Sequence, residues 1–187
     1  MNKNLLIKIE NISSGYGSTV IVNNFSFEVE QGQILSITGS NGMGKTTLMK
    51  TIMGLIEAKE GKITFKDEDI TNSSPNHRSK SGIGYVPQGR EIFSSLTVEQ
   101  NIMLPVYTRK KLPFSPQDKL EEIYSLFPIL KEKRNDNGSS LSGGQQQQLA
   151  IARALIFDPE IIILDEPAEG IQPSIVKFIG NTLLDLS

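Results

Sequence analysis

The 187-residue chain has no cysteine, no tryptophan and a single histidine, and these shortages narrow its chemistry. Without cysteine it can form no disulfide and offer no thiolate to a metal, which fits a reducing compartment such as the cytosol. Its 19 basic and 21 acidic residues give a net charge of −2. The chain therefore lacks the overall basic excess of proteins that bind duplex DNA or anionic lipid, and we expect no nucleic-acid partner.

Long apolar runs are also missing. The longest purely aliphatic run, residues 161–164, is far shorter than the roughly 20 apolar residues that span a bilayer. The first ten residues, MNKNLLIKIE, lack the apolar core of about 7–15 residues and the cleavage site of a signal peptide. We therefore expect one soluble domain that can still lie against a membrane protein.

Strand and helix signals alternate along the chain. Short β-rich runs predict strands over residues 5–9, 21–29, 34–38, 63–65, 83–86 and 161–164, with a polar loop through residue 79. Apolar residues at helical spacing predict helices over residues 48–55, 98–104, 118–130, 145–157 and 173–186. This alternation predicts a mainly parallel α/β sheet covered by helices, with a mostly helical lobe over about residues 89–155.

The segment GSNGMGKT, residues 39–46, fits G-x-x-x-x-G-K-[ST] between an expected strand and an expected helix. Its glycines let backbone N–H groups point at phosphate oxygens, and the helix that follows adds its positive N-terminal end. Lys45 supplies charge for the β- and γ-phosphates, and the Thr46 hydroxyl is placed to bind Mg²⁺. An ordinary glycine-rich turn is the plainer alternative. The nucleotide-binding prediction covers Gly39, Ser40, Asn41, Gly42, Met43, Gly44, Lys45, Thr46 and Thr47.

A second motif, IIILDEP, contains two acidic residues and occupies residues 161–167. We expect Asp165 to emerge at the carboxyl end of the sheet beside the phosphate loop, where it can hold the metal's hydration shell. Glu166 is a candidate base for the attacking water. A core strand that ends in two solvated acids would be preferred if the segment stood alone, but together with residues 39–46 it predicts nucleotide hydrolysis.

The segment LSGGQQQQLA, residues 141–150, looks at first like low-complexity glutamine tract. LSGGQ at the start of a helix, however, resembles the signature sequence of ATP-binding cassette (ABC) ATPases, and the resemblance covers essentially the whole chain. A serine hydroxyl, two glycines and a helix N-terminus make a second anion-binding surface. The resemblance implies a P-loop NTPase core with a RecA-like, mainly parallel sheet and an N-terminal antiparallel β part, plus a helical ABC subdomain.

In that family the signature of one subunit closes over the γ-phosphate bound to its partner, so that two ATP molecules are sandwiched in a head-to-tail dimer. The resemblance therefore gives Ser142, Gly143, Gly144 and Gln145 contacts with the partner's ATP. Residues 145–148 would begin a helix, because glutamine is a good helix former. Disordered low complexity remains a minor alternative.

Two smaller motifs carry further expectations. Tyr16 resembles the aromatic residue that stacks on adenine, although a plain loop tyrosine is the alternative. Gln88, in IGYVPQGR, resembles the glutamine that touches Mg²⁺ and the attacking water and senses the transmembrane partner; the alternative is a plain turn residue. Residues 89–105 would form part of the surface for a coupling helix of the membrane subunit, yet Ile92, Phe93 and Met103 suit a lobe core equally well.

The sequence departs from the family pattern in two places. Gln172 stands where the family usually has an aspartate in its interface loop. The family also has a histidine some thirty residues beyond Glu166, and this sequence ends at Ser187 before that point. We therefore expect the C-terminal part of the domain to be absent, in a fragment or in a weakened or inactive cassette. His77, in the expected polar loop, is predicted to be solvated.

The segments YVPQGREIF, LSGGQQQQLAIARAL and EGIQPSIV resemble the branch that imports branched-chain amino acids and amides, and most of all the ATP-binding subunit of urea importers. The resemblance implies an ATP- and Mg²⁺-dependent ATPase, with Glu166, Lys45, Gln88 and the partner's Ser142 as catalytic residues and with Thr46, Gln88 and Asp165 as metal ligands.

The resemblance also implies partners and a location. The partners would be a second cassette, identical or different, two transmembrane permease subunits and, indirectly, a periplasmic or extracellular solute-binding protein. The location would be cytoplasmic, on the inner face of the cell membrane. A nucleotide-binding but non-catalytic cassette is one alternative. A soluble cassette ATPase acting on DNA or ribosomes is another, disfavoured because the chain shows neither heptads nor a second cassette.

Overall fold

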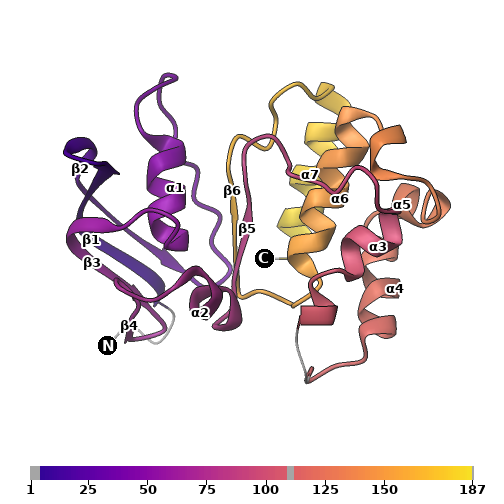
Figure 1. Ribbon diagram of the computed structural model, residues 1–187, viewed down its shortest axis with the longest axis horizontal. Coiled ribbons are helices and arrows are strands. Elements are labelled where there is room, and N and C mark those ends of the chain that lie inside the picture. Colours follow the sequence, from indigo (N-terminus) through magenta and orange to yellow (C-terminus); the bar gives the residue numbers. More distant parts are fainter. Residues whose placement is uncertain (1–4, 109–111, 187) are drawn as a thin grey trace. The chain divides into compact units, whose positions relative to one another are not determined.

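The computed structural model describes residues 5–108 and 112–186, and its contacts divide the chain into two units, Met1–Ile83 and Gly84–Leu186. The first unit is built on an antiparallel sheet with strand order β2-β1-β3-β4 (Figure 1). The strands are β1 (Leu5–Tyr16), β2 (Thr19–Glu30), β3 (Ala58–Phe65) and β4 (Glu68–Asp69). The strands predicted over residues 5–9, 21–29 and 63–65 are confirmed, and all three extend further than predicted.

Alternation along β1 explains which face of this sheet is buried. Ile7 and Ile9 are buried, whereas Lys8 and Glu10 between and after them are partly exposed. Ile9 lies opposite Phe27 on β2 and Ile63 on β3, so the apolar residues of three strands meet on one face. Asn11 and Asn24 take positive φ angles of 51° each where the register shifts, which lets β1 and β2 run on through segments with turn-like composition.

The prediction of a strand over residues 34–38 is wrong. The structure has irregular backbone there, and Ile34 and Leu35 are exposed. A strand needs a neighbour for its backbone N–H and C=O groups, and the ladders described among β1 to β4 do not include this segment.

Helix α1 (Lys45–Met53) follows the glycine loop and packs on the sheet through Leu48 and Ile52. The Thr51 hydroxyl donates to Oγ of Ser14 on β1 (2.9 Å), which ties the helix to the strand inside the core. The helix ends at Gly54, which has φ 77° and donates its N–H to the carbonyls of Lys50 and Thr51. Glycine suits this left-handed position because it has no Cβ.

The polar loop predicted through residue 79 is wrong, because residues 68–69 form β4 and Pro75–Lys80 form the short helix α2. Ser74 caps α2 and proline occupies its first turn, which is a common start signal. His77 is half-exposed, as predicted, and its Nε2 lies 3.3 Å from Oε1 of Glu68.

Arg78 on α2 is almost fully buried at the C-terminal end of α1. Its Nη1 donates to the carbonyls of Thr51 (2.9 Å) and Ile52 (2.7 Å), Nε donates to Ser73 (3.0 Å), and Nη2 donates to Thr71 (2.7 Å). Burial lowers the pKa of the guanidinium, but an arginine side chain stays protonated in proteins at neutral pH. One side chain therefore satisfies buried carbonyls at the end of α1 and fixes the loop before α2.

The second unit contains a separate two-stranded sheet and helices (Figure 1). Strand β5 (Ile83–Val86) pairs with β6 (Ile161–Leu164), and both have the predicted bounds. The helices are α3 (Val98–Met103), α4 (Pro116–Leu126), α5 (Pro128–Glu132), α6 (Gly143–Leu155) and α7 (Pro173–Asp185), with 3₁₀ turns η1 (Val106–Thr108) and η2 (Gly138–Ser140). Ile163 of β6 is buried, and Ile162 and Leu164 are partly buried against the hydrophobic core.

Local signals set the helix ends of this unit. Thr97 and Gln100 form a capping box at α3, and Ser115 caps α4 ahead of Pro116. The helix predicted over residues 118–130 is two helices, because Pro128 cannot continue α4 and instead starts α5. Ile102, Leu120, Phe127, Leu149 and Ile151 belong to one hydrophobic core that α3 to α6 share.

We predict that Arg78→Met destabilises the protein by about 2–4 kcal/mol, because it leaves several buried carbonyls without a donor. Chemical denaturation followed by circular dichroism measures the change. Arg78→Lys should be intermediate, since one ammonium cannot reach all four carbonyls. Lys80→Met, an exposed change on the same helix, is the control and should stay within about 0.5 kcal/mol of the wild type. Equal stability of the Arg78→Met and Lys80→Met variants would contradict the role of Arg78.

Candidate functional site

The glycine loop of residues 39–44 lies directly before α1 in the first unit. Gly42 and Gly44 have φ angles of 82° and 93°, a left-handed conformation that other residues adopt at a cost. A Cβ added at Gly44 would lie 3.0 Å from Cγ2 of Ile21, so packing also favours glycine there. The N–H of Met43 donates to the carbonyl of Ser40 (3.3 Å) and closes the turn.

The N-terminal end of α1 suits an anion. Gly44 is its cap residue, none of the described side chains caps it by a hydrogen bond, and its first turn has no acidic residue. The Lys45 ammonium bends back over the loop and donates to the carbonyls of Gly39 (2.8 Å) and Ser40 (3.2 Å). Helix N–H groups and a lysine at the same short loop are the donors that phosphate oxygens require.

The remaining predicted nucleotide residues of this unit differ in exposure. Thr46 is half-buried and Thr47 is buried, whereas Met43 is 71% exposed. Tyr16, at the end of β1, is 53% exposed at the hairpin turn that leads into β2. Lys59 stabilises this turn by donating to the carbonyls of Gly17 (2.7 Å) and Thr19 (3.1 Å). The Tyr16 ring is therefore presented on an ordered turn, as stacking on a base requires.

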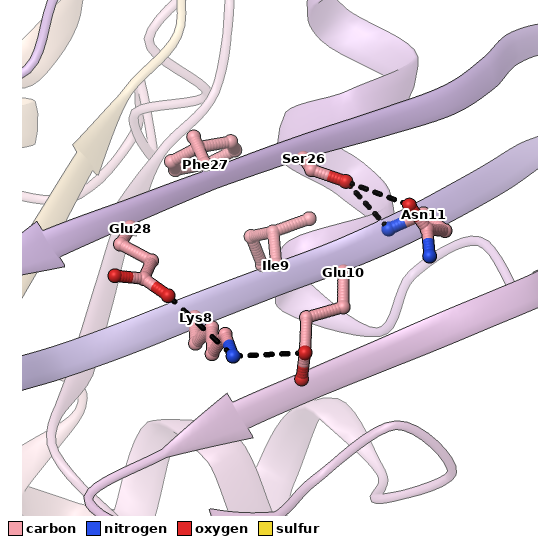
Figure 2. Close-up of a pocket in the computed structure, with 7 residues that line it drawn as sticks. All are labelled: Lys8, Ile9, Glu10, Asn11, Ser26, Phe27 and Glu28. Atoms are coloured by element: carbon pink, nitrogen blue, oxygen red, sulfur yellow. Dashed lines mark hydrogen bonds and ion pairs between the residues drawn. The ribbon is translucent and has the colours of Figure 1, made fainter. Parts of the chain in front are cut away.

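A shallow hollow on the sheet does not resemble a nucleotide site. It is lined by residues of β1 and β2, and Figure 2 shows its polar groups bonded to one another. Lys8 Nζ lies 2.9 Å from Glu10 Oε1 and 3.5 Å from Glu28 Oε1, and Ser26 Oγ donates to Oδ1 of Asn11 (3.1 Å). The hydrogen bond to Glu10 raises the pKa of Lys8. Because these polar groups are bonded to one another, the hollow is ordinary sheet surface and no candidate for the nucleotide site.

The acidic motif of the second unit continues the β5–β6 pairing. The N–H of Asp165 donates to the carbonyl of Val86 (3.0 Å), and Asp165 is only 3% exposed. Glu166 has φ 48°, an uncommon angle for a residue with a side chain. The chain therefore turns sharply between the two acids, and the Glu166 side chain is left half-buried.

Gln88 and Glu166, both predicted from the sequence, are brought together by the structure. Nε2 of Gln88 donates to Oε2 of Glu166 (3.3 Å) and also to Oε2 of Glu169 (3.1 Å). Glu169 was not predicted as a site residue. The sequence shows it only as the acid three positions after Glu166, and the contact spans 81 positions of the chain.

The described residues contain no group of three or more His, Cys, Asp or Glu side chains that could hold a metal ion. Mg²⁺ does not need such a group, because it commonly binds through one or two carboxylates together with substrate phosphates and water. The buried Asp165 carboxylate and the Thr46 hydroxyl are oxygen donors of the kind that Mg²⁺ prefers. The metal roles of Thr46, Gln88 and Asp165 stay predictions.

The signature segment begins α6 through a capping box. Ser142 Oγ accepts from the N–H of Gln145 (3.4 Å), and Oε1 of Gln145 accepts from the N–H of Ser142 (2.9 Å). The serine oxygen is used as an acceptor, so its O–H proton can be donated elsewhere. Gln147 and Gln148 are buried, so residues 145–148 form an ordered helix turn, which confirms the helix and rules out a disordered tract.

The two signature glycines lie close to neighbouring side chains. A Cβ at Gly144 would lie 3.1 Å from Cγ2 of Ile175 on α7, and one at Gly143 would lie 3.3 Å from Nη1 of Arg90. Arg90 also donates to the carbonyl of Glu169 (3.0 Å) and to Oε1 of Gln146 (3.4 Å). Sequence analysis missed this arginine, although its place two residues after Gln88 was a possible signal.

Some of the residues expected at the coupling surface pack against the hydrophobic core, and others are exposed to solvent. Ile92 and Met103 pack against the hydrophobic core, whereas Phe93 is 46% exposed. The Arg153 guanidinium lies 5.2 Å from the centre of the Phe93 ring. Gln172 stands at the N-cap of α7, where its side chain makes no capping bond within the described residues.

Comparison with known proteins gives a consistent result. The family model described as ABC transporter matches residues 22–169. The chain is 35% identical over 181 residues to the high-affinity branched-chain amino acid transport ATP-binding protein BraG of Pseudomonas aeruginosa, covering 97% of this chain and 77% of that protein. It is 37% identical over 182 residues to the lipopolysaccharide export system ATP-binding protein LptB of Haemophilus influenzae, covering 97% and 75%.

A solved structure supports the fold. The chain superposes on a nucleotide-free ATP-binding cassette from an ABC transporter with a TM-score of 0.84 and 29% identity, covering 97% of this chain and 77% of that one. This likeness confirms the predicted fold class, a P-loop NTPase of the ABC type with an antiparallel β part and a helical part. In the described part of the chain, no helix has both the length and the apolar character needed to cross a membrane.

The family match, the phosphate loop and the signature helix agree with one another. The chain belongs to the ABC transporter family. It is an ATP-binding subunit, an ATPase whose hydrolysis of ATP is coupled to transport.

Proposed function

We propose that the chain drives a bacterial importer of branched-chain amino acids or of short amides such as urea. BraG and the probable branched-chain amino acid transport protein LivF of Archaeoglobus fulgidus, 32% identical over 181 residues, support this branch. The glutamine run at residues 145–148 and the segment IQPS at residues 171–174 support the amide side of it by their resemblance to urea importers.

The observation that carries the proposed chemistry is the hydrogen bond between Gln88 and Glu166. Glu166 acts as the base that polarises the attacking water, and Gln88 orients that water and the carboxylate. Residues 39–47 hold the phosphates of ATP, Lys45 neutralises charge on the β- and γ-phosphates, and Tyr16 stacks on the adenine. Thr46, Gln88 and Asp165 would hold Mg²⁺, which would supply further positive charge at the γ-phosphate.

The signature helix acts on a second subunit in this proposal. Gly143, Gly144 and Gln145 place the N-terminal end of α6 against the γ-phosphate of ATP held by the partner, and Ser142 donates its O–H to that phosphate. A bacterial ABC transporter cassette with a TM-score of 0.83 and 27% identity was solved as a dimer, which supports pairing of this kind. ATP binding would close the pair and hydrolysis would reopen it.

The pair would lie at the cytoplasmic face of the cell membrane beneath two permease subunits. In an importer, a solute-binding protein outside the membrane would deliver the solute. The turn that follows Gln88 leads to the exposed Phe93, which places a candidate contact for a permease close in sequence to the glutamine. This arrangement supports communication between the permease and the water-activating pair.

Export of a lipid-linked substrate is the second candidate, because LptB of Haemophilus influenzae is as similar to this chain as the importers are. The nucleotide-handling residues serve either direction of transport. The direction therefore has to be decided by the permeases that the chain binds.

We predict that Glu166→Gln leaves ATP binding within about two-fold of the wild type and lowers turnover by about two orders of magnitude or more, since it removes the base but keeps the shape. Phosphate release and equilibrium nucleotide binding measure the two effects. An ATP-dependent dimer should accumulate in size-exclusion chromatography. Turnover that survives the change would remove Glu166 from its role.

We predict that Ser142→Asp keeps the stability of α6 within about 0.5 kcal/mol, because aspartate caps helices as well as serine does. It should nevertheless lower turnover by about 100-fold, because it loses the O–H donor and adds a negative charge facing the γ-phosphate. Thermal denaturation and ATPase assays separate the two effects. Ser142→Asn is the matched neutral cap and should keep much more of the activity. Equal turnover of the Asp and Asn variants would contradict the contact with phosphate.

We predict that ATPase activity of the chain, reconstituted in vesicles with the permeases of its own operon, rises several-fold when a branched-chain amino acid or urea is offered with its binding protein. The stimulation should need the outside-facing solute, because an importer responds to a loaded binding protein. Stimulation by a lipopolysaccharide precursor instead would establish the export candidate.

A further inference from the structure

The turn after Gln88 has a strained backbone. Gly89, Arg90 and Glu91 have φ angles of 81°, 70° and 45°, so three successive residues are left-handed and two of them carry side chains. Residues with a side chain adopt this region only at a cost in free energy, and such strain persists only where the surroundings hold it.

Arg153 on α6 holds this turn. Its Nη1 donates to the carbonyl of Glu91 (2.8 Å) and its Nη2 donates to the carbonyl of Arg90 (3.3 Å). The Phe93 ring lies against the same guanidinium. The strained turn is thus fastened to the signature helix, about two and a half turns after Gly144.

The turn directs Arg90 back to the start of that helix. Its guanidinium reaches Gln146 in the first turns of α6 and the carbonyl of Glu169 in the loop after Glu166. Arg90 therefore joins three segments of the second unit: the turn after Gln88, the signature helix and the loop that carries Glu169.

Glu169 completes the arrangement through Gln88. The amide nitrogen of Gln88 has two hydrogens, and its two acceptors are Oε2 of Glu169 and Oε2 of Glu166. When one hydrogen is held by Glu169, the amide cannot rotate freely and the other hydrogen stays directed at Glu166. Gln88 and Glu169 are exposed, so these bonds contribute little to stability and act mainly on orientation.

We propose that Glu169 and Arg90 are positioning residues, which hold Gln88 against Glu166 and link this pair to the Ser142 end of α6. The inference rests on the proposed roles of Gln88 and Glu166 in hydrolysis. It adds two residues that act through Gln88 and do not touch ATP themselves.

The test compares Glu169→Ala and Glu169→Gln in the purified protein. The Ala variant should lower kcat about ten-fold, a usual size for loss of an orienting partner, with less than about two-fold change in the Kd for ATP. The Gln variant keeps an acceptor for the Gln88 amide and should retain most of kcat. The melting temperature should not move in either variant. Glu132→Ala, an exposed change on α5, is the control and should match the wild type.

A double-mutant cycle tests whether Glu169 acts through Gln88. Gln88→Ala and the double variant Gln88→Ala/Glu169→Ala should have the same kcat, because the second change has nothing left to position. Arg90→Lys should lower kcat less than Arg90→Ala, since one ammonium can still reach the carbonyl of Glu169.

The outcomes separate this inference from the proposed function. If Glu166→Gln retains normal turnover, the proposed chemistry fails. If Glu166→Gln is inactive while Glu169→Ala keeps the wild-type kcat, the positioning role alone is overturned. Additive losses in the double variant, or a lower melting temperature that accounts for the loss in Glu169→Ala, would also overturn it.

Discussion

The structure depends on how the N-terminal ends of two helices satisfy their backbone N–H groups. The first N–H groups of any helix have no partner within the helix. At α1 the cap is a left-handed glycine and no described side chain bonds to it, so this end favours an anion supplied from outside. At α6 the cap is Ser142, whose partner Gln145 completes a reciprocal box. One end favours an anionic ligand, and the other is capped by its own residues while still presenting a hydroxyl proton.

Glycine serves different purposes at these two ends. Gly42 and Gly44 are required by positive φ angles, which shape the loop around a phosphate. Gly143 and Gly144 are helical, and a Cβ there would lie close to Arg90 on one side and to Ile175 of α7 on the other. The signature glycines thus allow two neighbouring segments to approach the helix end, in addition to any approach by a nucleotide. The two glycines that predict a contact with phosphate therefore also lie against neighbouring segments of their own chain.

The sequence predicts what depends on neighbours along the chain. The apolar runs at residues 83–86 and 161–164 are strands with the expected bounds, whereas the helix predicted over residues 118–130 is divided at Pro128. Residues 34–38 have strand composition but no described ladder partner, and composition cannot supply one. Arg78 was not predicted for a related reason, since two of its acceptors lie on another helix, 26 and 27 positions away. Gln88 and Glu166 were found because their motifs are distinctive. Arg90 and Glu169 were missed because their role consists of contacts across 79 and 81 positions.

Three arginines, Arg78, Arg90 and Arg153, bond to backbone carbonyls of neighbouring segments. Arg78 and Arg153 donate to carbonyls and, together with Arg90, hold loops whose own sequences would not specify one conformation. A carbonyl keeps its position whatever the pH, so a segment held in this way does not loosen when carboxylates nearby change their charge. This matters around Glu166 and Glu169, because a base must exchange protons during turnover. Arg90 anchors the loop by its backbone, and Gln88 is therefore the group that bridges the two carboxylates.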